Sequence, residues 1–148
     1  MKVSVIIPCF NAEKYLSECL DSVISQTHLD LQIICIDDGS TDLTGVILKQ
    51  YQQKDSRINV LTSHNQGAPA ARNLGLSVAE GVFIQFLDAD DILVGEKIEK
   101  QLAFFMKDVD IVVSDWIRMD ENLETTLERN TFEDIGSNPL SVAIRKII

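Results

Sequence analysis

The sequence predicts an α/β fold in which one mostly parallel sheet is flanked by helices. Two observations carry this prediction: apolar runs alternate with helical patterns as far as residue 114, and those runs are continuous. A strand that is covered on both faces of a sheet needs a continuous apolar run. Parallel strands also need right-handed crossovers between them, and the helical patterns supply these.

The strands are expected at the apolar runs, each of which ends in polar or turn residues. They are residues 3–8, 31–36, 58–61, 82–87 and 109–114. Pro8 is expected to halt the first strand, because proline donates no hydrogen bond to a sheet.

The helices are expected between the strands, at about residues 11–25, 40–54, 69–78 and 98–106. Asn11 can cap the first helix, and Ser40 or Thr41 can cap the second, because these side chains accept hydrogen bonds from free N–H groups. Pro69 suits the start of the third helix, where a missing N–H is tolerated.

The pattern changes after Trp116. Residues 120–138 are polar and acidic, and residues 139–148 have the apolar spacing of the start of an amphipathic helix. A helix with an apolar face needs a partner. We therefore expect one domain at residues 1–118, and at 119–148 a polar segment and the start of a helix from a truncated second part. Residues 140–148 are a candidate homodimer contact.

Composition excludes several classes of protein. The net charge of −10 argues against nucleic acid as a partner, because phosphate binding needs clustered Lys and Arg. No apolar run approaches the roughly 20 residues that span a bilayer. Cys9, Cys19 and Cys35 lack zinc-ligand spacing and are expected to be reduced thiols in the cytoplasm.

The most informative segment is Phe-Leu-Asp-Ala-Asp-Asp, residues 86–91, at the end of an apolar run. In an extended chain, residues i and i+2 point the same way, so Asp88 and Asp90 should face one point. Two such carboxylates repel each other unless a proton or a cation lies between them. Oxygen ligands favour Mg²⁺ or Mn²⁺, which often share substrate phosphates. The alternative is a solvated acidic turn or a helix cap.

Two further polar clusters follow predicted strands. Residues 8–11 follow the first strand, and Asp37 and Asp38 follow the second. If the strand order is third, second, first, fourth, all three clusters line one cleft at the carboxyl edge, where such sheets bind ligands. Arg72 lies near the start of the third helix, where N–H groups attract anions. The plainer interpretations are turn residues, helix caps and a solvated arginine.

Other nucleotide-binding patterns fit poorly. The first turn has no glycine, so the dinucleotide fingerprint GxGxxG is absent, and there is no GxxxxGK[ST]. A phosphoacceptor receiver domain would need an Asp after the third strand and a Lys after the fifth. Thr62 and Asp115 stand near those places instead.

Four segments together resemble the inverting family 2 glycosyltransferases, which have the Rossmann-like GT-A fold. They read VSVIIPCFNAEKYL at 3–16, IDDGSTD at 36–42, GAPAARNLG at 67–75 and FLDADDI at 86–92. The resemblance covers about residues 2–118. It implies that residues 1–118 are a nucleotide-sugar-binding domain.

The resemblance also implies roles for the nucleotide side of the site. Pro8 and Phe10 would lie against the nucleobase and ribose. Asp38 would accept a hydrogen bond from the base, usually uracil, and Arg72 would lie on the nucleotide side of the cleft.

The metal side follows from the Asp-x-Asp motif of the family. Asp90 would bind Mn²⁺ or Mg²⁺ directly, and Asp88 would hold the ribose or a metal-bound water. Asp91 is common at its place in the family. The general base of the family comes from the second half of the domain, and no residue of this chain is assigned to it.

The implied reaction is metal-dependent transfer, with inversion, from a nucleotide-sugar donor, such as a UDP-sugar, to a saccharide or lipid-linked acceptor. The implied setting is bacterial surface polysaccharide synthesis in the cytoplasm, with peripheral association at the inner face of the membrane left open. The alternative is a truncated nucleotide- and metal-binding module without catalysis. We expect these 148 residues to bind nucleotide and metal and to transfer sugar poorly or not at all.

Overall fold

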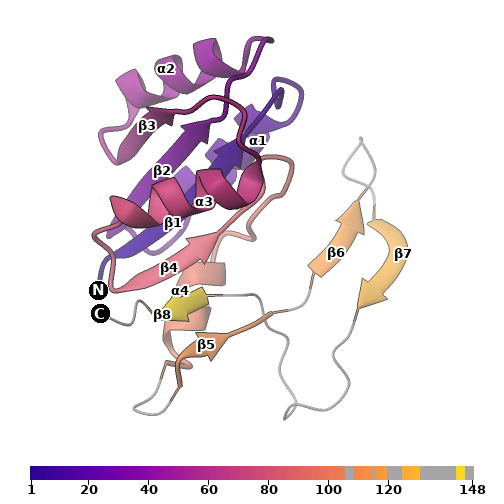
Figure 1. Ribbon diagram of the computed structural model, residues 1–148. Helices are drawn as coiled ribbons and strands as arrows, with labels where there is room; N and C mark the ends of the chain where they lie inside the picture. The colour runs from indigo at the N-terminus through magenta and orange to yellow at the C-terminus, as the bar shows by residue number, and fades with distance from the viewer. Residues whose placement is uncertain (106–108, 115, 120–124, 131–142, 146–148) are drawn as a thin grey trace.

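The computed structural model describes residues 1–105, 109–114, 116–119, 125–130 and 143–145. Its centre is a sheet in the order β3-β2-β1-β4-β8-β5, and β6 and β7 form a separate antiparallel pair (Figure 1). The first four strands are mutually parallel, in the order that the cleft prediction required. The strands are β1 Val3–Cys9, β2 Leu31–Asp37, β3 Ile58–Thr62, β4 Phe83–Phe86, β5 Ile111–Val112, β6 Trp116–Met119, β7 Thr125–Asn130 and β8 Ala143–Arg145.

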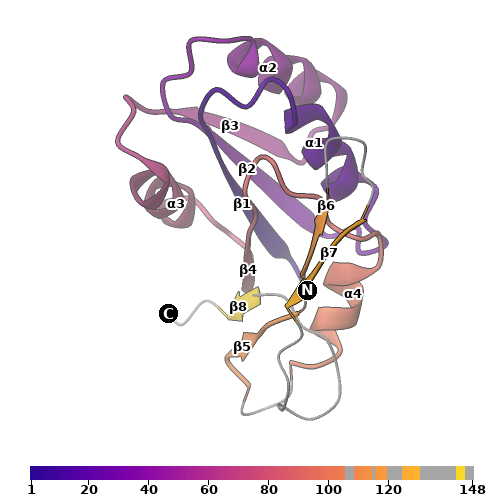
Figure 2. The same ribbon diagram turned by 90° about the vertical axis from the view of Figure 1, so that its right-hand side faces the viewer.

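Helices cover both faces of the sheet (Figure 2). They are α1 Leu16–Ile24, α2 Thr44–Lys54, α3 Ala68–Ser77 and α4 Lys97–Leu102. Ile6 and Ile34 point to the face under α3, and Val5 and Ile7 point to the face under α1, α2 and α4. This explains the continuous apolar runs, because each strand has a core on both sides.

The first strand runs one residue further than predicted, through Pro8 to Cys9. β4 pairs with β1 only as far as Ile6, so Pro8 lies where one side of β1 already has no ladder partner. Its missing N–H therefore removes no bond on that side, and the expectation that Pro8 halts the strand is wrong.

The predicted helix caps are also wrong. α1 begins at Leu16, and Asn11 lies before it with a left-handed φ of 48°. α2 begins at Thr44, whose N–H donates to Asp42 Oδ1 at 2.9 Å, so neither Ser40 nor Thr41 caps it. The side chains of Asn11 and Ser40 bond across to the other's loop instead, as the site shows below.

The C-terminal part differs most from expectation. The helix predicted from residue 139 is wrong at Ala143–Arg145, which form β8 between β4 and β5. The remaining residues of that predicted helix lie outside the described ranges. The candidate homodimer contact at residues 140–148 stays a prediction, and Ala143–Arg145 within it form β8. The predicted strand at 109–114 is reduced to Ile111–Val112, and the helix at 98–106 to α4.

Candidate functional site

The carboxyl edge of the sheet gathers three loops. Cys9 at the end of β1 pairs with Asp37 at the end of β2, and Ile6 of β1 pairs with Phe86 at the end of β4. The chain passes from β1 to β2 on one side and enters β4 on the other, so the strand order reverses at β1. Such a reversal is where open α/β sheets bind ligands.

Asp38, directly after β2, is buried with an exposed fraction of 2%. Its Oδ1 accepts hydrogen bonds from the Ser63 hydroxyl and from the Gln66 N–H, and its Oδ2 accepts from the Gly67 N–H at 2.7 Å. These bonds, first that from Ser63, hold the pKa of Asp38 below its ordinary value although burial opposes them. Asp38 is thus an anion that fastens the loop between β3 and α3.

The loops after β1 and β2 are bonded to each other. Asn11 N–H donates to Ser40 Oγ at 3.1 Å, and Asn11 Oδ1 accepts from Thr41 N–H at 2.9 Å. Glu13 makes a second pair of bonds between the same two loops. Its N–H donates to Asp42 Oδ2 at 3.1 Å, and its Oε2 accepts from Leu43 N–H at 2.8 Å. These reciprocal bonds set the position of the segment that carries Phe10.

Pro8 lies near the carboxyl end of β1 and Phe10 follows that strand directly, and their contact with the nucleobase and ribose stays a prediction. The Phe10 side chain is 47% exposed, and Pro8 is half-buried. A large exposed aromatic ring at the end of a central strand offers a face on which a flat ring can stack.

The acidic residues lie in the segment between β4 and α4, residues 87–96, which we call the acidic loop. Residues 88–91 form a turn, in which Asp91 N–H donates to the Asp88 carbonyl at 3.0 Å, rather than the extended chain that the sequence suggested. Asp88, Asp90 and Asp91 are exposed, and Ala89 between the first two is buried. Burial, with Asp90 and Asp88 adding repulsion, raises the pKa of Asp91.

Arg72 reaches the acidic loop from α3. Its Nη2 donates to Asp88 Oδ1 at 2.5 Å, and both side chains remain partly exposed. The ion pair joins the third helix to the end of the fourth strand. A guanidinium in this place can bind a phosphate in the same bidentate way that it binds a carboxylate.

The residues present fit a hard divalent cation that takes most of its ligands from a substrate. Exposed carboxylates of Asp88 and Asp90 supply oxygen atoms, and three acids within four residues concentrate negative charge that a cation would relieve. Among the described residues, no group of three or more His, Cys, Asp or Glu side chains could hold a metal ion by itself. Phosphate oxygens of a substrate, or water, could supply the further ligands of a metal.

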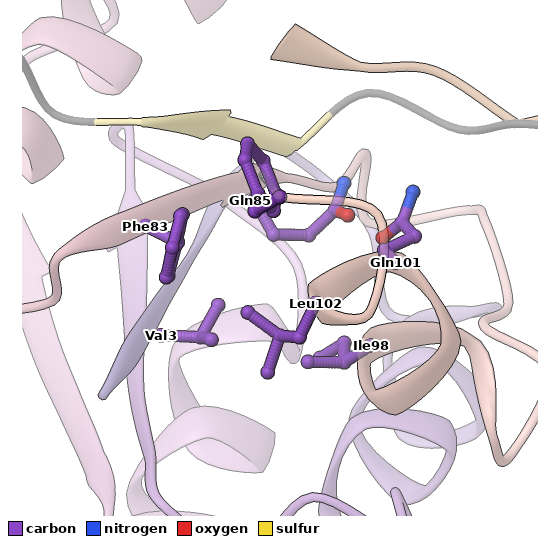
Figure 3. Close-up of a pocket in the computed structure, with 7 residues that line it drawn as sticks. Val3, Phe83, Gln85, Ile98, Gln101 and Leu102 are labelled. Carbon is purple, nitrogen blue, oxygen red and sulfur yellow. The ribbon is translucent and has the colours of Figure 1, made fainter. Parts of the chain in front are cut away.

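A small pocket lies elsewhere in the fold, between α4 and the starts of β1 and β4 (Figure 3). Its lining residues are Val3, Phe83, Gln85, Ile98, Gln101, Leu102 and Phe105. It lies towards the amino ends of the strands, and none of the predicted site residues lines it.

No helix in the described part of the chain is long and apolar enough to cross a membrane.

Sequence reasoning missed the residues that support the site. Ser63 received no role from the sequence, yet its hydroxyl bonds to Asp38. Ser22 and Gln26 are buried polar residues on or just after an otherwise apolar helix face, and they contact the acidic loop. That polar interruption of an apolar stripe is the signal that could have indicated them.

Comparison with known proteins places the chain among glycosyltransferases. TuaG of Bacillus subtilis, a glycosyltransferase ascribed to teichuronic acid biosynthesis, is 45% identical over 106 residues, which are 71% of this chain and 42% of TuaG. The chain spans less than half the length of the curated relatives that it matches most strongly.

Solved structures agree. S. aureus TarS (residues 1–349) aligns with a TM-score of 0.75 at 28% identity, over 98% of this chain and 47% of that one. Its complex with UDP aligns with a TM-score of 0.66 at 35% identity, over 81% and 36%. The mannosyltransferase PcManGT from Pyrobaculum calidifontis, solved with GDP-Man and Mn²⁺, has a TM-score of 0.72 over 78% of this chain and 35% of its own, and at 22% identity shows the fold alone.

The fold is therefore the GT-A fold that the four segments implied. The model of the family described as "Glycosyl transferase family 2" matches residues 4–143, nearly the whole chain. Matching sequence, strand order and acidic loop lead to one conclusion: the chain belongs to glycosyl transferase family 2.

Proposed function

We propose that this chain binds the nucleoside diphosphate of a UDP-sugar, together with Mn²⁺ or Mg²⁺, at the carboxyl edge of the sheet. One observation carries the proposal: the fold brings Asp38, Arg72 and the acidic loop to one edge, beside the exposed ring of Phe10. TarS, which aligns over most of the chain, has been solved with UDP.

Each residue of the candidate site has its own proposed contact with the donor or the metal. Pro8 and Phe10 flank the nucleobase and ribose, and Asp38 faces the base while it fastens the loop after β3. Arg72, now paired with Asp88, turns to the phosphates. Asp90 holds the metal directly, and Asp88 holds the ribose or a metal-bound water. When bound, the metal supplies positive charge that stabilises the departing nucleoside diphosphate.

In the whole protein, we propose transfer with inversion to a saccharide or lipid-linked acceptor in the synthesis of bacterial surface polysaccharides. The naming of TuaG supports this setting. The acceptor hydroxyl needs a general base. Asp115, Asp120 and Glu121 lie outside the described residues, and no general base is assigned. The proposed setting is the cytoplasm, where the buried cysteines stay reduced, with peripheral association at the inner face of the membrane left open.

A second candidate is a nucleotide- and metal-binding module without catalysis. The side chains gathered at the carboxyl edge are proposed binding groups and none is assigned as a general base, which favours it. Sugar transfer from UDP-sugars by these 148 residues alone distinguishes the two, and measurable turnover would exclude the module.

Calorimetric titration with UDP, with and without Mn²⁺, tests the proposal. We expect metal-dependent binding that is lost in Asp90→Ala. Glu80→Ala is the matched control, because it removes the same charge from an exposed residue that pairs with Lys2 at the other edge of the sheet. No binding of UDP by the wild-type chain would contradict the proposal for this base, and equal binding by Asp90→Ala would contradict the metal site.

A further inference from the structure

The acidic loop needs support from outside itself. It joins β4 to α4 and carries three exposed carboxylates within four residues. Like charges so close repel each other. Hydrogen bonds from other elements to the backbone of this loop oppose that repulsion.

Gln26 binds that backbone from the end of α1. Its side chain is buried, with an exposed fraction of 2%. Nε2 donates to the Val94 carbonyl at 2.8 Å, and Oε1 accepts from the Ile98 N–H at 3.2 Å. One amide thus bonds to the acidic loop and to the first turn of α4. The bond from Ile98 is costly to break, because Ile98 is only 2% exposed and its N–H would gain no water in exchange.

Ser22 and Cys19 continue the contact one and two helical turns earlier. The Ser22 hydroxyl donates to the Cys19 carbonyl at 2.6 Å and accepts from the Leu93 N–H at 3.1 Å. The Cys19 thiol donates to the Asp88 carbonyl at 3.6 Å. The spacing of three and four residues puts these side chains on one face of the helix. That face meets the loop from Asp88 to Ile98.

Apolar packing fixes the loop on the same side. Ala89 and Leu93 are 7% and 5% exposed and belong to the core that α1 covers. With Ala89 turned into the core, its neighbours Asp88 and Asp90 are turned outwards. Figure 2 shows α1 and α4 on the same side of the sheet, with the loop joining β4 to α4.

We propose that Gln26 and Ser22 are positioning residues, which hold the backbone of the acidic loop so that Asp88 and Asp90 stand at the carboxyl edge. The inference rests on the proposed function for its readout in binding. Neither side chain is among the groups proposed to touch the nucleotide or the metal. Their effect passes through the main chain at Leu93, Val94 and Ile98.

The chain offers a matched control in Gln32. This glutamine is also buried, with an exposed fraction of 9%, and its side chain also bonds to a loop. Its Oε1 accepts from the Ser4 hydroxyl and the Glu80 N–H, and its Nε2 donates to the Val78 carbonyl. Its loop lies before β4, at the opposite edge from the acids. Gln26→Leu and Gln32→Leu therefore remove the same chemistry from two buried sites, 2% and 9% exposed, and only Gln26 touches the acidic loop.

The experiment measures two quantities in each variant. Calorimetric titration with UDP and Mn²⁺ gives the Kd, and amide hydrogen exchange gives the protection of residues 88–98. Ser22→Ala is the milder second variant in case Gln26→Leu does not fold, and Ser22→Thr, which keeps the hydroxyl, tests rescue. We expect Gln26→Leu and Ser22→Ala to raise the Kd at least tenfold and to speed exchange in residues 88–98. Gln32→Leu should change the Kd less than threefold.

Equal weakening of binding by Gln26→Leu and Gln32→Leu, or faster exchange spread over the whole chain, would overturn the proposal and leave a general role in stability. Absence of UDP binding in the wild-type chain would instead count against the proposed function. In that case the exchange measurement still decides the positioning role, because selective loss of protection in residues 88–98 supports it and uniform loss refutes it.

Discussion

Asp38 shows how one residue serves both the fold and the site. The sequence marked it as one of two acids after a strand, and the family resemblance assigned it to the nucleobase. In the structure its oxygens accept hydrogen bonds from Ser63, Gln66 and Gly67. The loop that leads into α3, and hence the place of Arg72, depends on this buried anion. Geometry of this kind joins residues that are 25 or more positions apart, so no local pattern could reveal it.

Lys97 is a half-buried cation beside the acidic loop, and its charge gives a pH dependence. Its Nζ donates to Gln85 Oε1 at 3.2 Å. Burial lowers the pKa of Lys97 from 10.5 to about 8, although Asp91 opposes the shift. Between these values the unfolded chain binds more protons than the folded one, so this group makes the free energy of unfolding rise with pH. Its contribution is lost as the pH falls through about 8.

We predict that Lys97→Met removes this dependence. The free energy of unfolding of the variant, relative to wild type, should be most favourable at pH 7 and should decline as the pH rises towards 10. Urea unfolding at pH 7, 8, 9 and 10 measures it. The buried cysteines, whose raised pKa values lower stability above pH 9, act equally in both chains and cancel. Lys49→Met removes an exposed charge from α2 as the control. A difference that does not vary with pH would contradict the prediction.

At the scale of elements, α3 packs on the sheet through Gly75. A Cβ at this position would lie 2.5 Å from Ile6 Cγ2 and 3.0 Å from Ile36 Cδ1, and both isoleucines are fully buried. Gly75 therefore allows the helix that carries Arg72 to lie close to β1 and β2.

We predict that Gly75→Ala lowers the free energy of unfolding by about 1–2 kcal/mol. Overpacking costs about 1–3 kcal/mol, and the better helix propensity of alanine returns up to about 1 kcal/mol. Urea denaturation measures the change, and Ser77→Ala, exposed on the same helix, should stay within about 0.5 kcal/mol of wild type. A Gly75→Ala chain as stable as wild type would show that α3 can move away from the sheet at no cost.

The elements themselves were largely predictable where burial is two-sided. The apolar runs of β1 to β4 indicated strands because each strand has a core on both faces. The starts of α1 and α2 were not predictable, because Asn11 and Ser40 bond to each other's loops instead of to their own helices. Pro69 did indicate the start of α3. At Ala143–Arg145 the apolar spacing suited a helix, but the open edge of β4 supplies hydrogen bonds that a strand can use. Pairing across 58 or more residues decided that segment.

At the scale of the whole molecule, the sequence could indicate which residues lie near one another at the candidate site, but not how their side chains are arranged. The rule that ligands bind at the carboxyl edge, with the assumed strand order third, second, first, fourth, placed residues 8–11, Asp38 and Asp88 at one cleft in advance, and the family resemblance added Arg72. The turn at residues 88–91, the ion pair of Arg72 and the support from α1 depend on side-chain packing between distant segments. A sequence pattern does not show which side chains of distant segments lie in contact.

Binding at this edge should stabilise the entire fold, because the loops after β1, β2 and β4 would all contribute to one site. At a ligand concentration of about 100 times the Kd, a ligand that binds only the folded chain adds about 2.7 kcal/mol to the free energy of unfolding. For a chain of this size, that raises Tm by about 5–10 °C. We predict such a rise with UDP and Mn²⁺ together and a smaller one with UDP alone. Scanning calorimetry measures both.

Asp90→Ala distinguishes the rise in Tm caused by metal bound at the acidic loop from a general effect of metal on an acidic protein. Asp90 is exposed, and its charge works against Asp91, so the variant without ligand should unfold at or slightly above the wild-type Tm. With UDP and Mn²⁺ its Tm should rise no more than with UDP alone. If Mn²⁺ adds the same increment to both chains, the metal binds elsewhere on a surface whose net charge is −10, and the acidic loop is not its site.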